Sequence, residues 1–312
     1  MDRKVNRRRA LQAVVFGTLA PWFATRSDAA AVTPLPIKSA LGALEFARGG
    51  RLGVTLLDVD SGLHVGWRTT EHFGLCSTFK LPLAGLILRE ADRDALRLDE
   101  FVPYGRSDLV PFSPVTEVEL ARGGMTVEAL VRATQTTSDN TAANLLLGKL
   151  GGPAGFTSRL RDLGDTETRL DRLEPDLNRV QPREERDSTT PLAMARTVAR
   201  LMTTDALSLE SRARLKQWTL DTRTGLKRIR AGLPANWAAG DKTGTCIGAG
   251  LPKRINDVAI AWPPGRGPVI VTAYYESPDP TDAVTDQDES SLARVGSLAA
   301  EWITTVASGG ML

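Results

Sequence analysis

Cysteine and histidine are scarce in this chain of 312 residues, which contains only two of each. The two histidines, His64 and His72, are too few for a zinc hydrolase and have no metal-ligand spacing. The sequence also lacks the Gly-x-Ser-x-Gly turn of one large hydrolase class and the glycine-rich loop that binds phosphates. We therefore expect no metal ion and no cofactor.

A basic surface is also missing once the N-terminal segment is set aside. Residues 1–31 hold six of the 39 Lys and Arg but only two of the 37 Asp and Glu, so residues 32–312 carry a formal charge of −2. No basic stripe remains that would bind nucleic acid. With 42% hydrophobic and 24% charged residues, the chain has the composition of a globular protein.

Residues 1–31 have the features of an export signal peptide. Five basic residues between positions 3 and 9 precede an apolar run at 10–24, and three alanines at 29–31 form a cleavage site. The apolar run is too short to span a bilayer comfortably, and the arginines at 7–9 favour the twin-arginine route. We expect a periplasmic protein without a stable membrane anchor. The alternative is a basic amphipathic helix.

The order of predicted elements indicates an α/β protein of the α+β kind. Two strands come from the start of the chain and three from its end, with helices between them, which favours a five-stranded antiparallel sheet. We expect a sheet-containing subdomain from residues 32–70 and 222–312 and an all-helical subdomain from 71–221. The strands are predicted at 53–60, 63–67, 237–246, 257–262 and 269–276, the helices at 77–90, 208–218 and 287–306, with further helix starts after Thr126 and at Thr141, Pro153 and Thr190.

A serine and a lysine three residues apart begin the first of these helices. Ser77 and Lys80 lie on one helix face, close enough to touch. A serine hydroxyl needs a base to become a nucleophile, and a lysine can serve only where burial or its neighbours lower its pKa. Alone, the pattern also fits a surface serine and lysine without function.

Three further stretches supply groups that such a serine would need. Ser138-Asp139-Asn140 precedes a helix, where polar residues also make ordinary turns and caps. Glu174 and Asn178 lie in an irregular segment and could hold one water between them if that piece is helical; otherwise the segment is a solvated acidic loop. Lys242-Thr243-Gly244 lies on a predicted strand, where the glycine lets a ligand or another backbone approach closely.

Together, these four motifs resemble the signature set of the class A serine β-lactamases, in the same order along the chain. Arg172 and Asp187 stand where that family closes its omega loop with a salt bridge. Phe112 begins a segment that is similar to the family's aromatic gatekeeper, and Asn144 matches a structural asparagine. The resemblance runs from about residue 35 to the C-terminus. It implies the β-lactamase/D,D-peptidase-like fold and a small-molecule β-lactam substrate.

The resemblance also implies a role for each residue. Ser77 would attack the lactam carbonyl, with Lys80 or Glu174 as the base for acylation, which sequence leaves open. Ser138 would pass a proton to the lactam nitrogen, and Glu174 with Asn178 would hold the water that releases the acyl group. The backbone N–H groups of Ser77 and Thr245 would form the oxyanion hole. Substrate binding would fall to Asn140, Lys242, Thr243, Gly244, Thr245, Arg228 and Phe112.

Two cysteines flank these motifs. Cys76 and Cys246 are far apart in sequence, and in an exported protein they form either one disulfide or two buried thiols. In the family both segments border the same cleft, so the resemblance implies a disulfide. This pairing, with Thr245 and Arg228, is similar to the serine carbapenemases, from which Phe112 and the Ile247-Gly248 continuation depart.

Two rival functions remain open from the sequence. A penicillin-binding D,D-peptidase shares the Ser-x-x-Lys and Lys-Thr-Gly motifs but lacks a deacylating glutamate, so Glu174 and Asn178 disfavour it. A β-lactam-sensing module that is acylated and signals would need a transmembrane or signalling segment, and none follows residue 31. We therefore expect a β-lactam hydrolase that acts as a monomer.

Overall fold

The computed structural model describes residues 36–182, 184–248 and 250–307. The predicted signal peptide at 1–31 lies outside these residues. Within them, no helix combines the length and the apolar character needed to cross a membrane.

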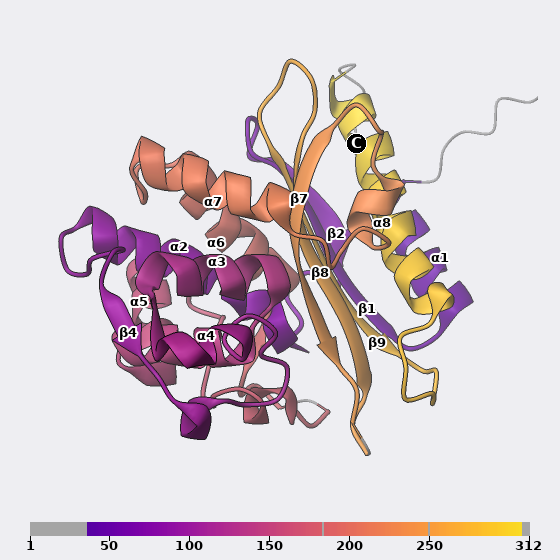
Figure 1. Ribbon diagram of the computed structural model, residues 1–312. Helices are drawn as coiled ribbons and strands as arrows, with labels where there is room; N and C mark the ends of the chain where they lie inside the picture. The colour runs from indigo at the N-terminus through magenta and orange to yellow at the C-terminus, as the bar shows by residue number, and fades with distance from the viewer. Residues whose placement is uncertain (1–35, 183, 249, 308–312) are drawn as a thin grey trace, which may run out of the picture. The chain divides into compact units, whose positions relative to one another are not determined.

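A five-stranded antiparallel sheet lies at the centre of the described chain, in the order β2-β1-β9-β8-β7 (Figure 1). The five-stranded sheet predicted from the sequence is confirmed. Strands β8 and β9 are buried along nearly their whole length because helices cover both faces of the sheet. The strands are β1 Arg51–Asp58, β2 His64–Trp67, β7 Ala238–Cys246, β8 Lys253–Trp262 and β9 Val269–Ser277.

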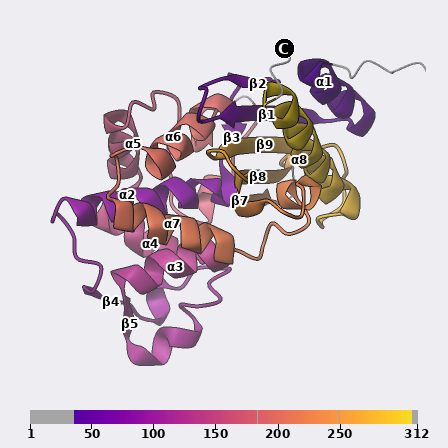
Figure 2. The ribbon, with the colours of Figure 1, turned by 90° about the horizontal axis from the view of Figure 1, so that it is seen from above.

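Alternate residues of the strands enter two different cores. Ile255 and Ala259 of β8 pack toward α1 (Ile37–Arg48) and α8 (Asp286–Ala307), whereas the side chain of Val258 packs on the opposite face. That second face carries the large helical layer seen in Figure 2. Its helices are α2 Lys80–Asp92, α3 Val127–Thr137, α4 Asn140–Lys149, α5 Gly152–Asp162, α6 Pro191–Thr203 and α7 Leu209–Asp221.

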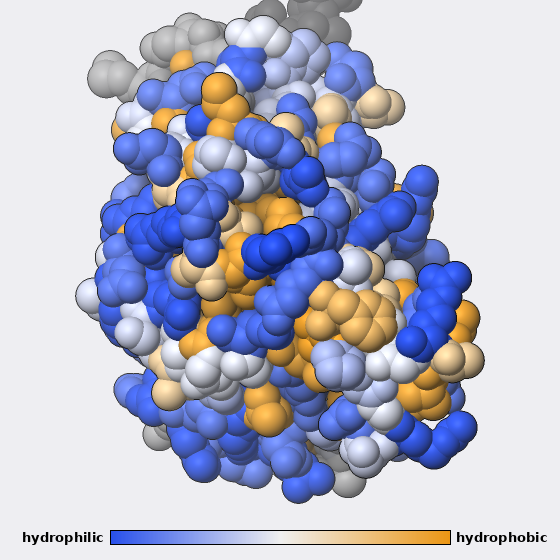
Figure 3. All heavy atoms as spheres, turned by 60° about the vertical axis from the view of Figure 1, so that its left-hand side comes forward, coloured by the Kyte–Doolittle hydropathy of each residue, from blue (hydrophilic) through white to orange (hydrophobic). Residues whose placement is uncertain are grey.

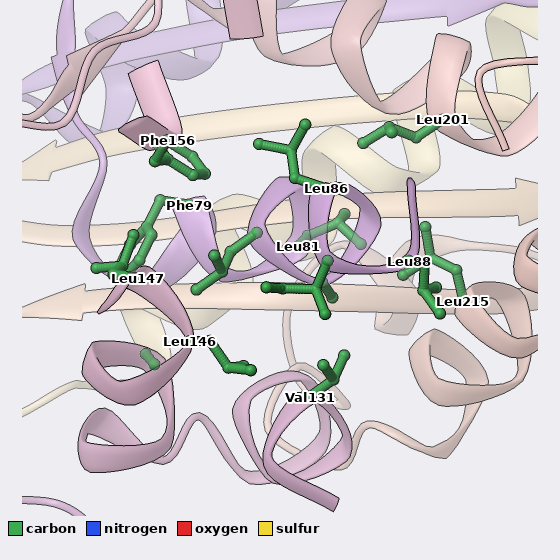
Figure 4. Packing of buried hydrophobic residues seen from close by; sticks show 14 of the residues in the cluster. Phe79, Leu81, Leu86, Leu88, Val131, Leu146, Leu147, Phe156, Leu201 and Leu215 are labelled. Carbon is green, nitrogen blue, oxygen red and sulfur yellow. The ribbon is translucent and has the colours of Figure 1, made fainter. Parts of the chain in front are cut away.

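Helix α2 is the buried axis of the helical layer. Every residue from Lys80 to Arg89 is buried, as expected for a helix that is apolar on all sides. Figure 4 shows other helices around it, and Phe79 meets Phe156 edge-on with ring centroids 6.0 Å apart. Lys80, the first residue of α2, is therefore held on a rigid, buried helix.

The remaining elements of the described chain are two small sheets and five short 3₁₀ helices. Strand β3 pairs with β6, and β4 pairs with β5. Their bounds are β3 Phe73–Gly74, β4 Phe101–Pro103, β5 Gly124–Thr126, β6 Ser188–Thr189, η1 Cys76–Phe79, η2 Arg106–Asp108, η3 Val118–Arg122, η4 Asp176–Asn178 and η5 Ile229–Gly232.

The structure also corrects several predicted boundaries. The helix predicted from residue 77 begins as the 3₁₀ turn η1 and becomes α-helical at Lys80, and β8 begins four residues earlier than predicted. Helix α4 starts at Asn140 because the Asp139 side chain accepts a hydrogen bond from the Ala142 N–H at 2.8 Å. Helix α1 was not predicted from the sequence. The predicted caps at Thr126, Thr190 and Ser208 are confirmed.

Candidate active site

Ser77 lies in a tight turn at the start of the buried helix α2. The turn is the 3₁₀ helix η1, and Cys76 enters it with φ of 44°, a region that non-glycine residues rarely adopt. Thr78 closes the turn by donating its hydroxyl to the Leu75 carbonyl at 2.7 Å. Ser77 itself stays partly accessible, while both of its neighbours are buried. The turn therefore presents one hydroxyl to solvent.

Lys80 points at this hydroxyl from inside the protein. Its Nζ lies 3.0 Å from Ser77 Oγ and 3.0 Å from Glu174 Oε1, and its side chain has no exposed surface. Burial lowers the pKa of Lys80, and the Glu174 carboxylate opposes that effect. Glu174 Oε1 also accepts a hydrogen bond from Ser77 Oγ at 3.4 Å. Two groups able to take a proton thus contact the same serine.

In the Ser138-Asp139-Asn140 stretch, the middle residue stabilises the local structure and the other two contact Lys80. Asp139 is structural, since it caps α4 and accepts hydrogen bonds from the Val115 and Thr116 N–H groups, each at 2.9 Å. Ser138 follows α3 with φ of 63°, and its carbonyl and hydroxyl lie 2.8 and 3.3 Å from Lys80 Nζ. The Asn140 amide oxygen also accepts from Lys80 Nζ.

Phe112 lies beside Asn140 and holds it through the backbone. Its carbonyl accepts a hydrogen bond from the Asn140 N–H at 3.0 Å, and its φ of 65° is again in the left-handed region. The Asn140 side-chain amide donates to the Pro111 carbonyl at 2.8 Å. Phe112 is 64% exposed, so it is free to contact a ligand.

Glu174 is fixed by partners on its backbone and on its side chain. Asn144 of α4 accepts from the Glu174 N–H and donates to its carbonyl, each at 2.9 Å. Asn178 Nδ2 donates to Glu174 Oε2 at 2.7 Å across the 3₁₀ helix η4. Arg172 Nε pairs with Asp187 Oδ2 at 2.5 Å where the ends of the same segment meet. The alternative of a solvated acidic loop is therefore wrong at Glu174, which is buried with its carboxylate turned inward.

The opposite wall of the cleft is strand β7. Lys242 is fully buried, and its Nζ donates to Ser138 Oγ at 3.1 Å and to the Thr243 carbonyl at 2.8 Å. Burial and the nearby charge of Lys80 lower the pKa of Lys242 to about 7. A Cβ on Gly244 would lie 3.0 Å from the Leu75 carbonyl oxygen, so this glycine allows the strand to pack against the serine turn.

Arg228 links the end of β7 to its surroundings. Its guanidinium donates to the Gly244 carbonyl at 3.1 Å, to the Asn256 carbonyl at 2.8 Å and to Thr245 Oγ1 at 2.8 Å. Thr243 Oγ1 donates to Thr224 Oγ1 at 2.8 Å. The two hydroxyls beside Lys242 are therefore oriented by other side chains.

The two cysteines are free thiols in this structure, so the predicted disulfide is not formed in it. Their expected proximity is confirmed, because their side chains share a hydrogen bond. The Cys246 thiol also donates to the Asn178 carbonyl at 3.1 Å. Whether such a pair is oxidised depends on the redox potential of its surroundings, which the sequence does not contain.

Sequence reasoning missed two buried acids beneath Lys242. Asp241 pairs with Arg230 Nη1 at 3.1 Å, and Asp257 accepts from the Ile229 N–H at 3.1 Å. Burial raises the pKa of both carboxyl groups. A charged residue within an apolar strand, as Asp257 is within β8, was the available signal.

The arrangement brings the Ser77 hydroxyl, two side chains able to accept its proton, the Ser138 hydroxyl and the buried Lys242 ammonium into one connected set of contacts. The described residues contain no cluster of three or more His, Cys, Asp or Glu side chains able to hold a metal ion. Activation of a serine for acyl transfer is the chemistry that these groups support.

Comparison with family models matches residues 36–303 to the "Beta-lactamase enzyme family". Among curated proteins, the β-lactamase AST-1 of Nocardia asteroides is 47% identical over 78% of this chain and 76% of its own length. The β-lactamase L2 of Stenotrophomonas maltophilia is 43% identical over 94% and 97%. The carbapenem-hydrolysing β-lactamase KPC of Klebsiella oxytoca is 41% identical over 88% and 92%.

Solved structures give the same result. A reconstructed ancestral class A β-lactamase of Gram-negative bacteria superposes with a TM-score of 0.80 at 48% identity, over 86% of this chain and all of the other. A class A enzyme of Rhodopseudomonas palustris, described as putative, has a TM-score of 0.80 at 45% identity, over 85% and 99%.

Proposed function

The chain belongs to the β-lactamase enzyme family as a class A serine enzyme that hydrolyses the β-lactam amide bond and gives antibiotic resistance, and we propose that the cleft described above is its active site. The observation that carries the proposal is the joint contact of Lys80 and Glu174 with the Ser77 hydroxyl.

Acylation begins with attack of Ser77 Oγ on the lactam carbonyl carbon. The hydroxyl proton passes to Lys80 or to Glu174, both of which contact Ser77 Oγ. Ser138 then delivers a proton to the lactam nitrogen as the ring opens. Its hydroxyl suits this relay because it lies 3.3 Å from Lys80 Nζ and 3.1 Å from Lys242 Nζ.

Deacylation requires a water molecule activated by Glu174. Asn178 donates to one carboxylate oxygen of Glu174, while Lys80 and Ser77 contact the other. The backbone N–H groups of Ser77 and Thr245 would stabilise the oxyanion in both steps, at roughly 3–4 kcal/mol per donor. The same donors serve formation and breakdown of the acyl-enzyme.

The substrate carboxylate is bound by the β7 wall. Lys242 supplies a buried positive charge, and Thr243 and Thr245 supply hydroxyls that Thr224 and Arg228 orient. Asn140 and Phe112 contact the other end of the substrate, supported by their shared backbone hydrogen bond.

Replacing Glu174 tests the assignment directly. Glu174→Ala should acylate with a penicillin and then accumulate a long-lived acyl-enzyme, visible as the mass of protein plus intact drug. Glu185→Ala is the matched control, since Glu185 is an exposed carboxylate of the same segment. Rapid turnover by Glu174→Ala would overturn the deacylation role.

Neither rival function is favoured by the comparisons. A D,D-peptidase would cleave acyl-D-Ala-D-Ala peptides and release β-lactams slowly, and a sensor would keep its acyl group. Steady-state hydrolysis of a penicillin by the wild-type protein, without activity on the peptide, excludes both.

Carbapenem hydrolysis and a Cys76–Cys246 disulfide extend this proposal. Contact between the two thiols, the Arg228–Thr245 hydrogen bond and 41% identity to a carbapenem-hydrolysing enzyme support them. A kcat for imipenem no faster than that of ordinary penicillinases would contradict carbapenemase activity. Under oxidising conditions Cys76→Ser should lower stability by about 2–4 kcal/mol, and an unchanged melting temperature would contradict a structural disulfide.

We propose export to the periplasm and action as a monomer for the mature protein. The basic and apolar segments at 1–31 support export. Apolar residues on the face in Figure 3 form groups broken up by hydrophilic ones, as on monomer surfaces. N-terminal sequencing of the periplasmic protein and light scattering test the two statements.

A further inference from the structure

Cys246 borders a pocket from which a small molecule could contact it. It lies in the wall of a pocket of about 500 Å³, together with Asn178, Thr245, Ile247 and Leu251. Both cysteines are buried, Cys246 at 6% and Cys76 at 2% exposure, but Cys76 is not among the described residues of that wall. A small molecule in the pocket would therefore meet the Cys246 sulfur first.

A buried cation faces the same sulfur. Arg254 pairs with Cys246 across strands β7 and β8 and is 1% exposed. Its Nε pairs with Glu276 at 3.2 Å and its Nη2 donates to the Val180 carbonyl at 2.9 Å, while its Nη1 has no partner among the described residues. An ionised Cys246 sulfur is an acceptor for this guanidinium.

The neighbours of the two sulfurs favour ionisation of Cys246 over Cys76. The hydrogen bond from Cys76 and the charge of Arg254 lower the pKa of Cys246 to about 7. The hydrogen bond to Cys246 and burial raise the pKa of Cys76. Thiolates, not thiols, attack disulfides, so the more accessible sulfur is also the better nucleophile at neutral pH.

We propose that Cys246 is a thiol–disulfide exchange site of the folded enzyme, which accepts small disulfides from the pocket and passes the bond to Cys76. The proposal deepens the cysteine pairing proposed above, because it states which sulfur reacts first and from which side. It holds whichever β-lactams the enzyme hydrolyses.

The exchange has two balanced steps. The Cys246 thiolate attacks a small disulfide RSSR, forms Cys246–S–S–R and releases one RS⁻. Cys76 then loses its proton and attacks the Cys246 sulfur, which forms the Cys76–Cys246 disulfide and releases the second RS⁻. The small disulfide is the oxidant, and it is reduced to two thiols.

The mixed disulfide should disturb the deacylation machinery. Cys246 Sγ donates to the Asn178 carbonyl, and Asn178 holds Glu174. A group attached to Cys246 fills the pocket beside Asn178 and Thr245. Release of the group by Cys76 empties the pocket, so inhibition should last only as long as the mixed disulfide.

The aryl disulfide DTNB, which releases a coloured thiolate, tests the order of reaction on the reduced, folded protein. Wild type should release two thiolates per chain and retain no adduct by intact mass. Cys76→Ser should release one and retain the adduct, and Cys246→Ser should react only on the timescale of unfolding. Equal reaction of both single variants, or no reaction of folded Cys76→Ser, would overturn the proposal.

Two further measurements separate this proposal from general folding effects and from the catalytic assignment. In the wild-type protein the rate of the first thiolate release should be half-maximal near pH 7, and Arg254→Gln, which removes the nearby positive charge, should raise that midpoint. The adduct on Cys76→Ser should lower the kcat for penicillin, and dithiothreitol should restore it. An unchanged kcat would contradict the link to Asn178. Glu174→Ala should exchange thiols normally, so failure of exchange and failure of the catalytic roles are distinguishable.

Discussion

Lys80 and Lys242 occupy opposite walls of the cleft, and both are fully buried with Nζ within 3.3 Å of Ser138 Oγ. Their partners differ. Lys80 Nζ contacts the Glu174 carboxylate at 3.0 Å, whereas the partners of Lys242 Nζ among the described residues are hydroxyl and carbonyl oxygens. Burial lowers the pKa of both, and only for Lys80 does a contacting carboxylate oppose it.

The difference suits the two lysines to different tasks. Lys80 and Glu174 form a compensated pair in which a proton can move without creating net charge in the interior. Lys242 lacks such a partner, so an anionic substrate is what compensates its charge. The two lysines are equally buried, but because only Lys80 has a carboxylate partner, Lys80 is suited to proton transfer and Lys242 to anion binding.

The largest expected effect comes from Lys80→Met. It removes the base or its partner from Ser77, so kcat and kcat/KM should both fall by about 10²–10⁴. Steady-state hydrolysis of a chromogenic cephalosporin measures this. The matched control is Lys149→Met, which removes a partly exposed lysine at the end of α4. If Lys80→Met changed KM alone, Lys80 would act in substrate binding as Lys242 does, and the proposed difference between the two lysines would be wrong.

Lys242→Met should act mainly on binding. Loss of one charge-assisted hydrogen bond, at about 1.5–3 kcal/mol, should raise KM for a β-lactam carboxylate roughly 10–150-fold. The methyl ester of the same β-lactam is the control substrate, because it carries no charge for Lys242 to bind. Equal losses for acid and ester would show that Lys242 acts on the reacting bond instead.

The sequence predicts which residues the structure brings together around Ser77, but not the electrostatics of that group. The spacing of Ser77 and Lys80 predicts their contact because one helix turn enforces it. Ser138 and Lys242 meet through tertiary packing although they are 104 residues apart, so no local pattern predicts their contact. Helix α1 was missed because Pro36 provides no side-chain cap and the first turn has no acidic residue, which removes two start signals.

The pH dependence should also differ between acid and ester substrates. With a pKa of about 7, Lys242 is charged below that pH and neutral above it. The kcat/KM for a carboxylate substrate should therefore fall about tenfold per pH unit above pH 7. A bound carboxylate raises the pKa of Lys242 again, so kcat should hold to higher pH. The ester should show no such fall in kcat/KM, and parallel profiles would contradict the assignment to Lys242.

Asp257→Asn should have the smallest effect, and it tests whether Lys242 really lacks a compensating anion. Burial raises the pKa of Asp257 well above its usual range, which favours the protonated carboxyl, and Asn reproduces the shape and charge of that form. The kcat/KM at pH 7 should change by less than about twofold, which is below 0.5 kcal/mol.

Asp187→Asn is the contrasting variant, because it breaks the ion pair with Arg172 and should lower the melting temperature. An ionised Asp257 would instead support the charge of Lys242, and its replacement would move the fall in kcat/KM to lower pH. That shift would mean that both lysines have carboxylate partners, and the contrast between the two walls would then rest on distance alone.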